Sequence, residues 1–580
     1  MGGAMILLYN PLSTTPGKQP LPLSLMALAA VLETRGEAWA LVDGNVVPDP
    51  AAEIVARLSA LTRSRFALLA VTVMPGPQLT QAVAVCRRVR EALPHVSIVW
   101  GGYFPTQHAD TVLRSPYVDF VIRSQGERAL LQLVDVLRSG GLLNSVGGLS
   151  WKGGSGRAGG SDRSGESGRS GGLSRSDGSG RAGGSDRSDG SGESGRSDGL
   201  SRSDGSGRSG GLGRSGGLGR SGGSWSASLS DERNDQVVNN PVQPLTTLDD
   251  LPDLPYHRVD MRRYVQKNYL GHRTVAHNSS FGCPFACSFC AVVAMSNRRW
   301  LAQSPARLER VMRHLVKTYG VDAVQMHDMD FFISEARTEE FARRIDGLGL
   351  RWWALGRVDT LMQYSDATWE QMARAGLAMV FSGAESGTDE VLARMNKGGR
   401  ASAALTLELA RRMRHYGIVP EFSFVLGCPP DPEQDVATTF EFIRRIKRIN
   451  PSTEIVLYTY TPVPLDGRLY AEARRRGFAF PETLEEWASP DWEQLSMRRG
   501  DGIPWMEGTG ADIRRRIRNF ERVINAYYPT VTDARLTGWH RAALKAASAW
   551  RYALKWYHAP YELRVLHRLI PYQRPETTGF

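Results

Sequence analysis

The sequence predicts an α/β protein: a doubly wound parallel sheet, then a partial (β/α)6 barrel and a mainly helical C-terminal region. Two observations predict this order. Short apolar runs alternate with segments of helical periodicity over residues 1–145, and the same alternation returns over residues 271–480. Strands that alternate with helices form parallel sheets, because each helix carries the chain back to the edge where the next strand begins.

The first sheet, over residues 1–145, is expected to be flavodoxin-like. Its strand candidates are residues 6–9, 39–43, 66–73, 97–100 and 120–123. Its helical candidates are residues 21–35, 51–61, 79–93, 109–114 and 126–138. Ligands of such sheets bind beyond the carboxyl ends of the strands. This places a binding site in the loops at 10–19, 43–46, 74–77 and 101–106.

A connecting region, residues 146–270, contains a low-complexity insertion at 153–224. The insertion is rich in Gly, Ser, Arg and Asp, and its eleven arginines nearly balance its eight acidic residues. Because it has too few apolar side chains for a core, we expect a disordered insertion, and a binding role, for instance toward RNA, is the alternative. The flanks at 148–151 and 236–239 have strand character, so the insertion is expected to lengthen the turn of a β-hairpin.

The second sheet, over residues 271–480, has six β/α units. Its strand candidates are residues 274–279, 323–327, 351–355, 378–383, 420–426 and 454–461. Its helical candidates are residues 305–319, 335–346, 366–375, 402–416, 435–449 and 467–475. Six such units fit a partial (β/α)6 barrel, in which functional residues lie at the C-terminal ends of the strands.

The helical region at 481–580 carries one long apolar stripe. The stripe comprises Trp539, Ala543, Ala546, Trp550, Leu554 and Tyr557. Two interpretations stay open: the stripe docks a helix on the barrel, or it forms an interfacial helix that approaches a lipid substrate. From residue 535 onward, eight Lys and Arg stand against two Glu. This surplus indicates either a solvated basic face or attraction to an anionic membrane surface or an acidic substrate.

Composition and charge bear on three further questions: nucleic-acid binding, membrane-spanning helices and localisation. The formal net charge is +11, yet no nucleic-acid-binding motif accompanies it. No run of about 18 apolar residues predicts a membrane-spanning helix. The first ten residues lack the basic segment of a signal peptide, so we expect a cytoplasmic protein.

Three cysteines, Cys283, Cys287 and Cys290, lie within eight residues at C-x3-C-x2-C spacing on a glycine-containing loop. A [4Fe–4S] cluster normally takes four thiolates, so three leave one iron open for a small molecule. Structural zinc is the alternative, but it commonly needs a second Cys or His pair, which is not spaced that way here. Cys86 and Cys428 are isolated in the sequence.

The cysteine motif, with Phe289 directly before its third cysteine, resembles that of radical SAM enzymes. The resemblance implies that S-adenosylmethionine (SAM) binds the open iron and that an external one-electron reductant, such as flavodoxin or ferredoxin, drives its cleavage to a 5′-deoxyadenosyl radical. It also implies a reducing compartment, in agreement with so few cysteines.

Polar residues that follow the second, third and fourth barrel strands are candidates for the SAM or substrate site. Asp328 and Asp330 resemble an acidic-Phe motif of cobalamin-binding radical SAM enzymes, with helix capping as the alternative. Arg357 could pair with the carboxylate of SAM, or only with Asp359. Glu385 and Ser386 lie in a segment that resembles the SAM-binding segment of this subgroup, where they would bind the amino group and the ribose.

Cys428 stands where the family often carries Leu in a Gly-Leu-Pro turn after the fifth strand. A role near the substrate or cofactor is one interpretation, and packing is the other.

The first domain resembles the cobalamin-binding domain of the same subgroup. The resemblance implies a cobalamin site at Asn10, Thr72, Gly101, Gly102 and Glu127. Glycines would let the corrin and nucleotide tail lie against the backbone. The D-x-H-x-x-G motif, which supplies a cobalt-ligating His elsewhere, is absent, and a Gly-Glu-Gly-Glu segment is altered to Ser-Gln-Gly-Glu. The alternative is that this domain no longer binds cobalamin and serves only for packing within the protein.

Together these resemblances imply a radical SAM enzyme with a [4Fe–4S] cluster, SAM and cobalamin. The expected activity is methylation of an unactivated carbon of a small-molecule or lipid-like biosynthetic intermediate. The alternatives are non-methylating radical chemistry with the same cofactors, such as oxidative cyclisation or rearrangement, and a cobalamin-binding sensor or electron carrier. An intact cysteine triplet argues against the sensor, which needs none.

Overall fold

The computed structural model describes most of the chain outside the low-complexity insertion. The described residues are 5–14, 17–60, 66–153, 236–397, 400–465, 467–496, 505–506, 509–533 and 535–570. Residues 154–224 of the predicted insertion lie outside this set, so its expected disorder stays a prediction. Everything described belongs to one compact unit.

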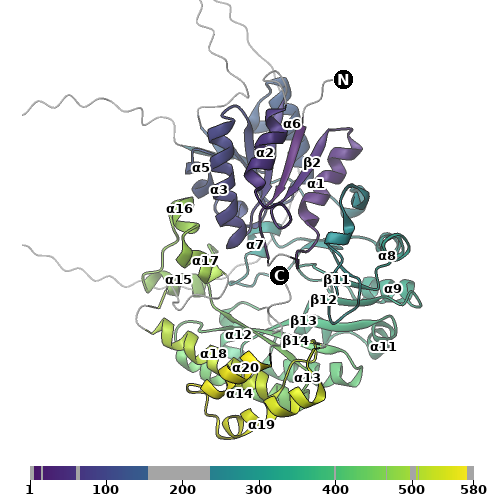
Figure 1. Ribbon diagram of the computed structural model, residues 1–580, viewed down its shortest axis with the longest axis vertical. Helices are drawn as coiled ribbons and strands as arrows, with labels where there is room; N and C mark the ends of the chain where they lie inside the picture. Colours follow the sequence, from purple (N-terminus) through teal and green to yellow (C-terminus); the bar gives the residue numbers. More distant parts are fainter. Residues whose placement is uncertain are drawn as a thin grey trace, which may run out of the picture. The chain divides into compact units, whose positions relative to one another are not determined.

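The N-terminal sheet has the predicted parallel, flavodoxin-like arrangement, with strand order β2-β1-β3-β4-β5 (Figure 1). Its strands are β1 (Met5–Asn10), β2 (Trp39–Asp43), β3 (Ala67–Thr72), β4 (Ser97–Gly101) and β5 (Phe120–Ile122). Both faces are buried, because Leu7 and Tyr9 join the core on one side while Ile6 and Leu8 join the core on the other. The nearly continuous apolar runs of the sequence reflect this double burial.

Helices cover both faces of this sheet. The first face carries α1 (Leu23–Thr34) and α6 (Glu127–Ser139), and the second carries α2 (Pro50–Ser59), α3 (Pro77–Ala92) and α5 (Ala109–Arg114). A short helix, α4 (Tyr103–Gln107), follows β4 directly. All five predicted strands and helices are confirmed, with ends that differ by a few residues.

The predicted hairpin around the insertion is also confirmed. Strands β6 (Leu149–Lys152) and β7 (Val237–Asn239) pair antiparallel with each other, and β6 continues the sheet beside β5. Four 3-10 turns lie in and after the first domain: η1 (Leu143–Ser145), η2 (Leu248–Asp250), η3 (Tyr256–Arg258) and η4 (Met261–Arg263).

The second sheet has six parallel strands in sequential order, as expected for a partial (β/α)6 barrel. They are β8 (Thr274–His277), β11 (Ala323–Met326), β12 (Arg351–Arg357), β13 (Leu377–Glu385), β14 (Val419–Leu426) and β15 (Glu454–Thr459). The helices are α8 (Pro305–Tyr319), α9 (Glu335–Ile345), α10 (Val358–Leu361), α11 (Asp366–Arg374), α12 (Asp389–Arg394), α13 (Ala403–His415), α14 (Pro432–Ile449) and α15 (Arg468–Arg475). The sequence does not predict the small ribbon of β9 (Ser280–Gly282) and β10 (Trp300–Ala302), nor α7 (Val292–Ser296) between them.

One buried carboxyl on the second sheet gives a stability prediction. Burial raises the pKa of Glu421 from 4.5 to about 7, although the Trp353 indole N–H donates to its Oε2 at 2.9 Å. The folded state therefore holds this proton more tightly than the unfolded state, and stability falls as the pH rises from about 4.5 to about 7. The decrease is roughly 3 kcal/mol.

Glu421→Gln is expected to remove this part of the pH dependence, because the amide keeps an acceptor for Trp353 and cannot ionise. Urea unfolding between pH 4.5 and 8 measures the difference. Glu485→Gln, at a side chain that is 49% exposed, is the matched control and should leave the pH profile unchanged. A parallel pH profile for wild type and Glu421→Gln would contradict the assignment.

The C-terminal region comprises α16 (Leu484–Trp487), α17 (Pro490–Ser496), α18 (Gly510–Tyr527), α19 (Gly538–Leu554) and α20 (Tyr561–Leu569). The ring of Phe520 on α18 stacks on that of Phe440 on α14 at 3.8 Å between centroids. Among the helices of the described part, none combines the length and the apolar character that crossing a bilayer requires.

Of the two interpretations of the apolar stripe on α19, docking on the barrel is wrong. Trp539, Trp550 and Leu554 of that stripe are 68%, 48% and 70% exposed. The helix is instead buried through its other side, on Leu544, Ser548, Arg551 and Tyr552. Tyr552 stacks on Tyr527 with ring centroids 4.1 Å apart, and Arg551 pairs with Glu562, so ring stacking and a partly buried ion pair decide the orientation.

Candidate active site

The three motif cysteines lie on a loop that the β9–β10 ribbon closes. Cys287 is buried and the other two are half-buried. Burial raises the pKa of Cys283 to about 12 and that of Cys290 to about 11, and the neighbouring thiols act on both in the same direction. The thiols of Cys283 and Cys290 therefore keep their protons near pH 7 unless a metal binds them.

Gly282 is required at the start of this loop. Its φ is +83°, and an added Cβ would lie 2.2 Å from the Arg299 carbonyl oxygen and 2.6 Å from the Ser296 Cβ. Only glycine permits this close crossing of the chain in front of Cys283.

The loop is fastened to the segment after α12. The Ser288 N–H donates to the Met395 carbonyl at 2.9 Å, and the Asn396 amide donates to the Ala286 carbonyl at 2.8 Å. These bonds link the cysteine loop to the residues that follow α12, beyond the predicted SAM-binding residues Glu385 and Ser386.

Arg357, at the end of β12, connects the thiols to this segment. It donates to Cys287 Sγ at 3.2 Å and to both carboxylate oxygens of Asp359 at 3.0 and 2.9 Å, and also to the Lys397 carbonyl. Its guanidinium lies 3.8 Å from the centroid of the Phe285 ring. Arg357 therefore pairs with Asp359, as one of the two alternatives expected, and it also donates to a cysteine sulfur. Its pairing with the carboxylate of SAM stays a prediction.

Glu385 forms a buried ion pair with Lys397, whose Nζ lies 2.6 Å from Glu385 Oε1. Glu385 has φ +62°, at an irregular register between β13 and β14. Gly383 makes room for the pair, since a Cβ there would lie 1.9 Å from Glu385 Oε1 and 2.5 Å from Lys397 Nζ. The strained backbone aims the carboxylate toward the barrel mouth.

Lys397→Met is expected to lower the free energy of unfolding by about 3–5 kcal/mol, because it leaves the Glu385 carboxylate buried without its cation. Adding Glu385→Gln should recover most of this loss. Arg394→Met is the matched control: its pair with Glu390 has side chains 35% and 76% exposed and should cost about 1 kcal/mol or less. Urea unfolding measures all three, and equal losses for Lys397→Met and Arg394→Met would contradict the prediction.

Ser386 and Cys428 lie behind the ion pair of Glu385 and Lys397. They are joined by the carboxylate of Asp435, a residue that the sequence analysis did not single out. The Ser386 hydroxyl donates to Asp435 Oδ1 at 3.3 Å, and Asp435 Oδ2 accepts the N–H groups of Gly427 and Cys428 at 2.9 and 3.1 Å. Cys428 is 1% exposed and lines neither of the two cavities described below. Packing is therefore its better-supported role.

Asp328 and Asp330 follow β11 and are fully buried. Asp328 Oδ1 accepts the N–H and the hydroxyl of Ser279 at 3.0 Å each, which ties β11 to β8. Asp330 interacts electrostatically with both Arg357 and Cys283, and burial raises its pKa to about 7. Its Oδ2 has no hydrogen-bond partner among the described residues.

A cavity of about 570 Å³ opens at the barrel mouth, and we call it the aromatic cavity. Cys290, Phe289 and Glu385 line one side of it, and Tyr103 and His108 of the first domain line another. Burial raises the pKa of Tyr103 to about 12, and Cys290 acts in the same direction, so the phenol lies near the cysteine loop. Aromatic rings dominate the lining: Tyr103, Phe289, Phe381, Tyr458, Tyr460, Phe480, Trp487 and Trp492.

The segment after the barrel closes this cavity. Phe480 and Trp487 pack against His108 with ring centroids 5.2 and 4.8 Å away, and Arg87 pairs with Glu485 at 2.6 Å. Burial lowers the pKa of His108 to about 4, so this ring is neutral near pH 7. No sequence pattern predicted that these residues return to the first domain.

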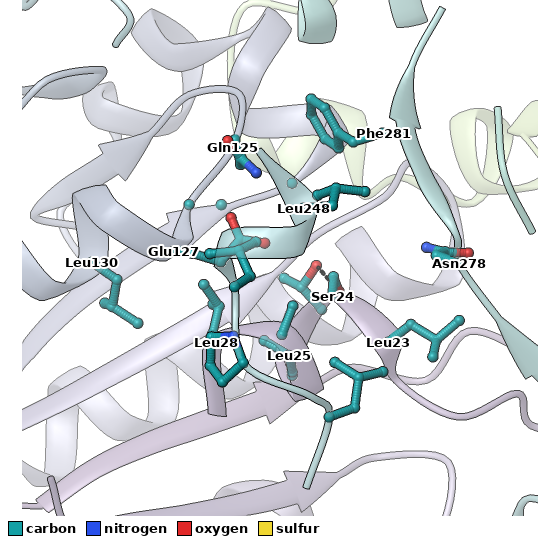
Figure 2. Close-up of a pocket in the computed structure, with 18 of the residues that line it drawn as sticks. Leu23, Ser24, Leu25, Leu28, Gln125, Glu127, Leu130, Leu248, Asn278 and Phe281 are labelled. Atoms are coloured by element: carbon teal, nitrogen blue, oxygen red, sulfur yellow. Dashed lines mark hydrogen bonds between the residues drawn. The ribbon is translucent and has the colours of Figure 1, made fainter. Parts of the chain in front are cut away.

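A second cavity, of about 280 Å³, lies at the carboxyl ends of β3, β4 and β5. Thr72, Gly101, Gly102 and Glu127, four of the five predicted cobalamin residues, line it. Figure 2 shows Glu127, Gln125 and Ser24 among leucines of α1 and α6. Burial raises the pKa of the Glu127 carboxyl, although backbone N–H groups at the start of α6 oppose the shift. We call this the sheet-edge cavity.

The fifth predicted residue, Asn10, lies outside this cavity in a buried polar network. Its amide donates to Asp43 Oδ1 at 3.0 Å and its Oδ1 accepts from Gln78 at 3.2 Å. Tyr264, from the connecting region, donates to Asp43 Oδ2 at 2.8 Å. Asn10 therefore orders the loops after β1 and β2.

The three cysteine thiols and the sheet-edge cavity fit the cofactors that the motifs imply, an iron–sulfur cluster and cobalamin. Among the described residues, no three His, Cys, Asp or Glu side chains are arranged to hold a single metal ion. In an iron–sulfur cube, however, each thiolate binds a different iron, so the sulfurs need not meet at one point. The sheet-edge cavity has an apolar floor, and at Gly102 no side chain enters it.

Comparison with known proteins identifies both domains. Residues 10–134 match the B12 binding domain, and residues 277–443 match the Radical SAM superfamily. The chain is 26% identical to an uncharacterized methyltransferase, PH0819, of Pyrococcus horikoshii, over 38% of this chain and 46% of that protein. It is 22% identical to an anaerobic magnesium-protoporphyrin IX monomethyl ester cyclase of Synechocystis, over 77% of this chain and 72% of the cyclase. The match thus spans less than half of the first relative and about three quarters of the second.

Solved structures agree on the fold. The radical S-adenosylmethionine methyltransferase TsrM of Kitasatospora setae, with cobalamin and a [4Fe-4S] cluster bound, matches with a TM-score of 0.54 and 15% identity, over 82% of this chain and 75% of TsrM. The cobalamin-dependent radical enzyme OxsB matches with a TM-score of 0.57 and 14% identity, over 98% of this chain and 72% of OxsB. The chain thus contains a B12 binding domain at residues 10–134 and a radical SAM domain at residues 277–443, and these two domains imply a [4Fe–4S] cluster, SAM and cobalamin as cofactors.

Proposed function

We propose that this enzyme methylates an unactivated carbon of a largely apolar small molecule bound in the aromatic cavity. One observation carries the proposal: Cys290 of the cysteine loop and Tyr103 of the B12-binding domain line the same cavity. A substrate bound there would lie next to both the cysteine loop and the B12-binding domain. When bound, the cluster with SAM supplies a carbon radical and cobalamin supplies a transferable methyl group.

Cys283, Cys287 and Cys290 would hold the cluster, and the Arg357 N–H on Cys287 would stabilise that sulfur as a thiolate. Glu385 would accept from the amino group of SAM, with Lys397 fixing its orientation. Phe289 contributes a ring to the same wall. Ser386 would act by holding the chain, through Asp435, rather than by direct contact.

Thr72, Gly101, Gly102 and Glu127 would hold cobalamin at the sheet-edge cavity, whose apolar floor suits the nucleotide tail. Asn10 would support the neighbouring loops. Because the sequence lacks the D-x-H-x-x-G motif, no histidine from that motif would ligate cobalt.

The lining of the aromatic cavity favours a flat, apolar substrate. Its described lining includes no Lys or Arg, and its one carboxylate, Glu385, is paired with Lys397. The ring of Tyr460 lines the cavity, while its hydroxyl is buried and has no hydrogen-bond partner among the described residues. Phe480, Trp487 and Trp492 are proposed to select the substrate by stacking.

The test is anaerobic reconstitution with iron, sulfide and cobalamin, followed by reductant, SAM and apolar aromatic candidate substrates. An external one-electron donor such as flavodoxin or ferredoxin is the proposed physiological reductant. Both 5′-deoxyadenosine and S-adenosylhomocysteine, with a methylated product, are expected by mass spectrometry. Omitting cobalamin should remove S-adenosylhomocysteine and the methylated product, but not 5′-deoxyadenosine.

Formation of 5′-deoxyadenosine with product but without S-adenosylhomocysteine would instead favour non-methylating chemistry. The name of the Synechocystis relative, a cyclase, makes this the second candidate. Loaded protein that cleaves no SAM with any candidate would contradict both.

A further inference from the structure

The outer face of α19 and α20 exposes an unusual number of large apolar side chains. Trp539, Trp550, Leu554, Tyr561, Val565 and Leu569 are between 48% and 75% exposed, and Trp556, in the turn between the helices, is 55% exposed. Isolated exposed apolar residues are ordinary on protein surfaces, but these seven lie on two helices that contact each other and on the turn between them, which indicates a binding surface. We call this set the outer face.

The outer face is a regular feature of two well-anchored helices. On α20, Tyr561, Val565 and Leu569 recur every four residues, on one side of the helix. On α19, Trp550 and Leu554 share a stripe with Trp539, and Ala542 and Ala546, at helical spacing between them, are exposed as well. Figure 1 shows α19 and α20 beside α18, against which both pack. Leu544 and Ile570 are buried on the inner side, so the orientation is fixed by packing.

Positive charge accompanies these apolar groups. Lys545, Lys555, Arg564 and Arg568 are exposed on the same two helices and their connecting turn. Lys555 pairs with Glu441, but Lys545, Arg564 and Arg568 have no carboxylate partner within ion-pair distance in the described chain. The one acidic residue of α20, Glu562, is already paired with the buried Arg551. The outer face is therefore both apolar and cationic.

We propose that the outer face binds the surface of an anionic lipid bilayer. Trp and Tyr favour the bilayer interface, because their rings are apolar at one end and polar at the other. Unpaired Lys and Arg beside them are attracted to anionic headgroups, whereas a protein partner would need matching carboxylates. The contact is peripheral: α19 and α20 lie along the surface with their outer face toward the lipid. It is independent of the proposed reaction.

The test is flotation of the reconstituted full-length protein with two kinds of vesicle. We expect binding to vesicles of 30% phosphatidylglycerol in phosphatidylcholine, and little to pure phosphatidylcholine. Trp550→Ser with Leu554→Ser should reduce the partition coefficient about ten-fold or more. The matched control, Leu142→Ser with Val242→Ser, replaces apolar residues that are 52% and 46% exposed elsewhere and should change nothing.

The charge is tested separately by Arg564→Gln with Arg568→Gln. Each arginine near the surface contributes about 1 kcal/mol, so the pair should reduce partitioning about thirty-fold. Arg262→Gln with Arg310→Gln, at side chains 88% and 61% exposed, gives the same change in net charge and should have no such effect.

Three results would overturn the proposal: no flotation with anionic vesicles, equal binding to both vesicle types, or equal loss in the control variants. Mass photometry in the absence of lipid tests the competing occupant. A dimer that Trp550→Ser with Leu554→Ser converts to monomer would assign the outer face to a second copy of the chain.

Discussion

Cys287→Ala is expected to abolish SAM cleavage and to prevent assembly of the iron–sulfur cluster. The thiol is the most buried of the three motif cysteines and accepts an N–H from Arg357 at 3.2 Å, so its loss removes a ligand and leaves a buried guanidinium N–H unpaired. Two thiolates do not replace three on a cube that already lacks a fourth. Iron content, the visible absorbance of the cluster and 5′-deoxyadenosine should all fall, the last by more than about 100-fold.

The chain supplies its own matched controls, since Cys86 and Cys428 are also buried. Cys86 accepts the Trp100 indole N–H at 3.3 Å in the core of the first domain, and Cys428 lies behind the barrel mouth. Cys86→Ala and Cys428→Ala should keep full iron content, with a loss of stability of about 1–2 kcal/mol. Equal iron in Cys287→Ala and wild type would refute the ligand assignment, whereas loss of iron in Cys428→Ala would restore a cofactor role for that thiol.

The parts of the fold that the sequence predicted are those with local causes. Residues 39–43, 109–114 and 305–319 form the expected elements with the expected ends, because apolar runs and helix caps mark them. The Ser304 side chain, for example, accepts the Arg307 N–H at the start of α8. The cysteine motif is equally local, since all three thiols belong to one loop.

The contacts of the site could not be predicted, because they join distant residues. Arg357 and Cys287 are 70 positions apart, and the ion pair of Glu385 with Lys397 depends on a bulge and on φ +62° at a residue that is not glycine. No sequence pattern indicates which cation returns to a given carboxylate. The sequence therefore did not predict that Lys397 pairs with Glu385.

The docking interpretation of the α19 stripe was wrong for a related reason. Helical periodicity finds an apolar stripe, but it does not say what covers the stripe. On α19 the inner side carries Tyr552 and Arg551, whose partners Tyr527 and Glu562 lie on α18 and α20. A stacked ring and an ion pair thus occupy the position that an apolar contact was expected to fill.

Gly102→Val is expected to prevent cobalamin binding while leaving the iron–sulfur cluster in place. Gly102 has φ +100°, and even a Cβ would lie 3.1 Å from Thr72 Oγ1 and 3.3 Å from the backbone of Val73. The two methyl groups of the valine would enter the sheet-edge cavity, which Thr72 and Gly101 also line. Cobalamin retained after gel filtration, measured by absorbance, should fall at least about ten-fold, because overpacked sites exclude their ligand. Iron content should not change.

Gly36→Val separates the loss of cavity space from backbone strain. Gly36 also has a left-handed conformation, with φ +74°, but nothing lies within 4 Å of an added Cβ. Gly36→Val should therefore lose about 1–2 kcal/mol of stability from the backbone alone. Gly102→Val should lose more, because its φ of +100° and ψ of −160° lie in a region essentially restricted to glycine, and only this variant should lose cobalamin. Full cobalamin content in Gly102→Val would move the cofactor away from the sheet-edge cavity. Loss of cobalamin in Gly36→Val as well would show that strain in the first domain, rather than the shape of the cavity, controls binding.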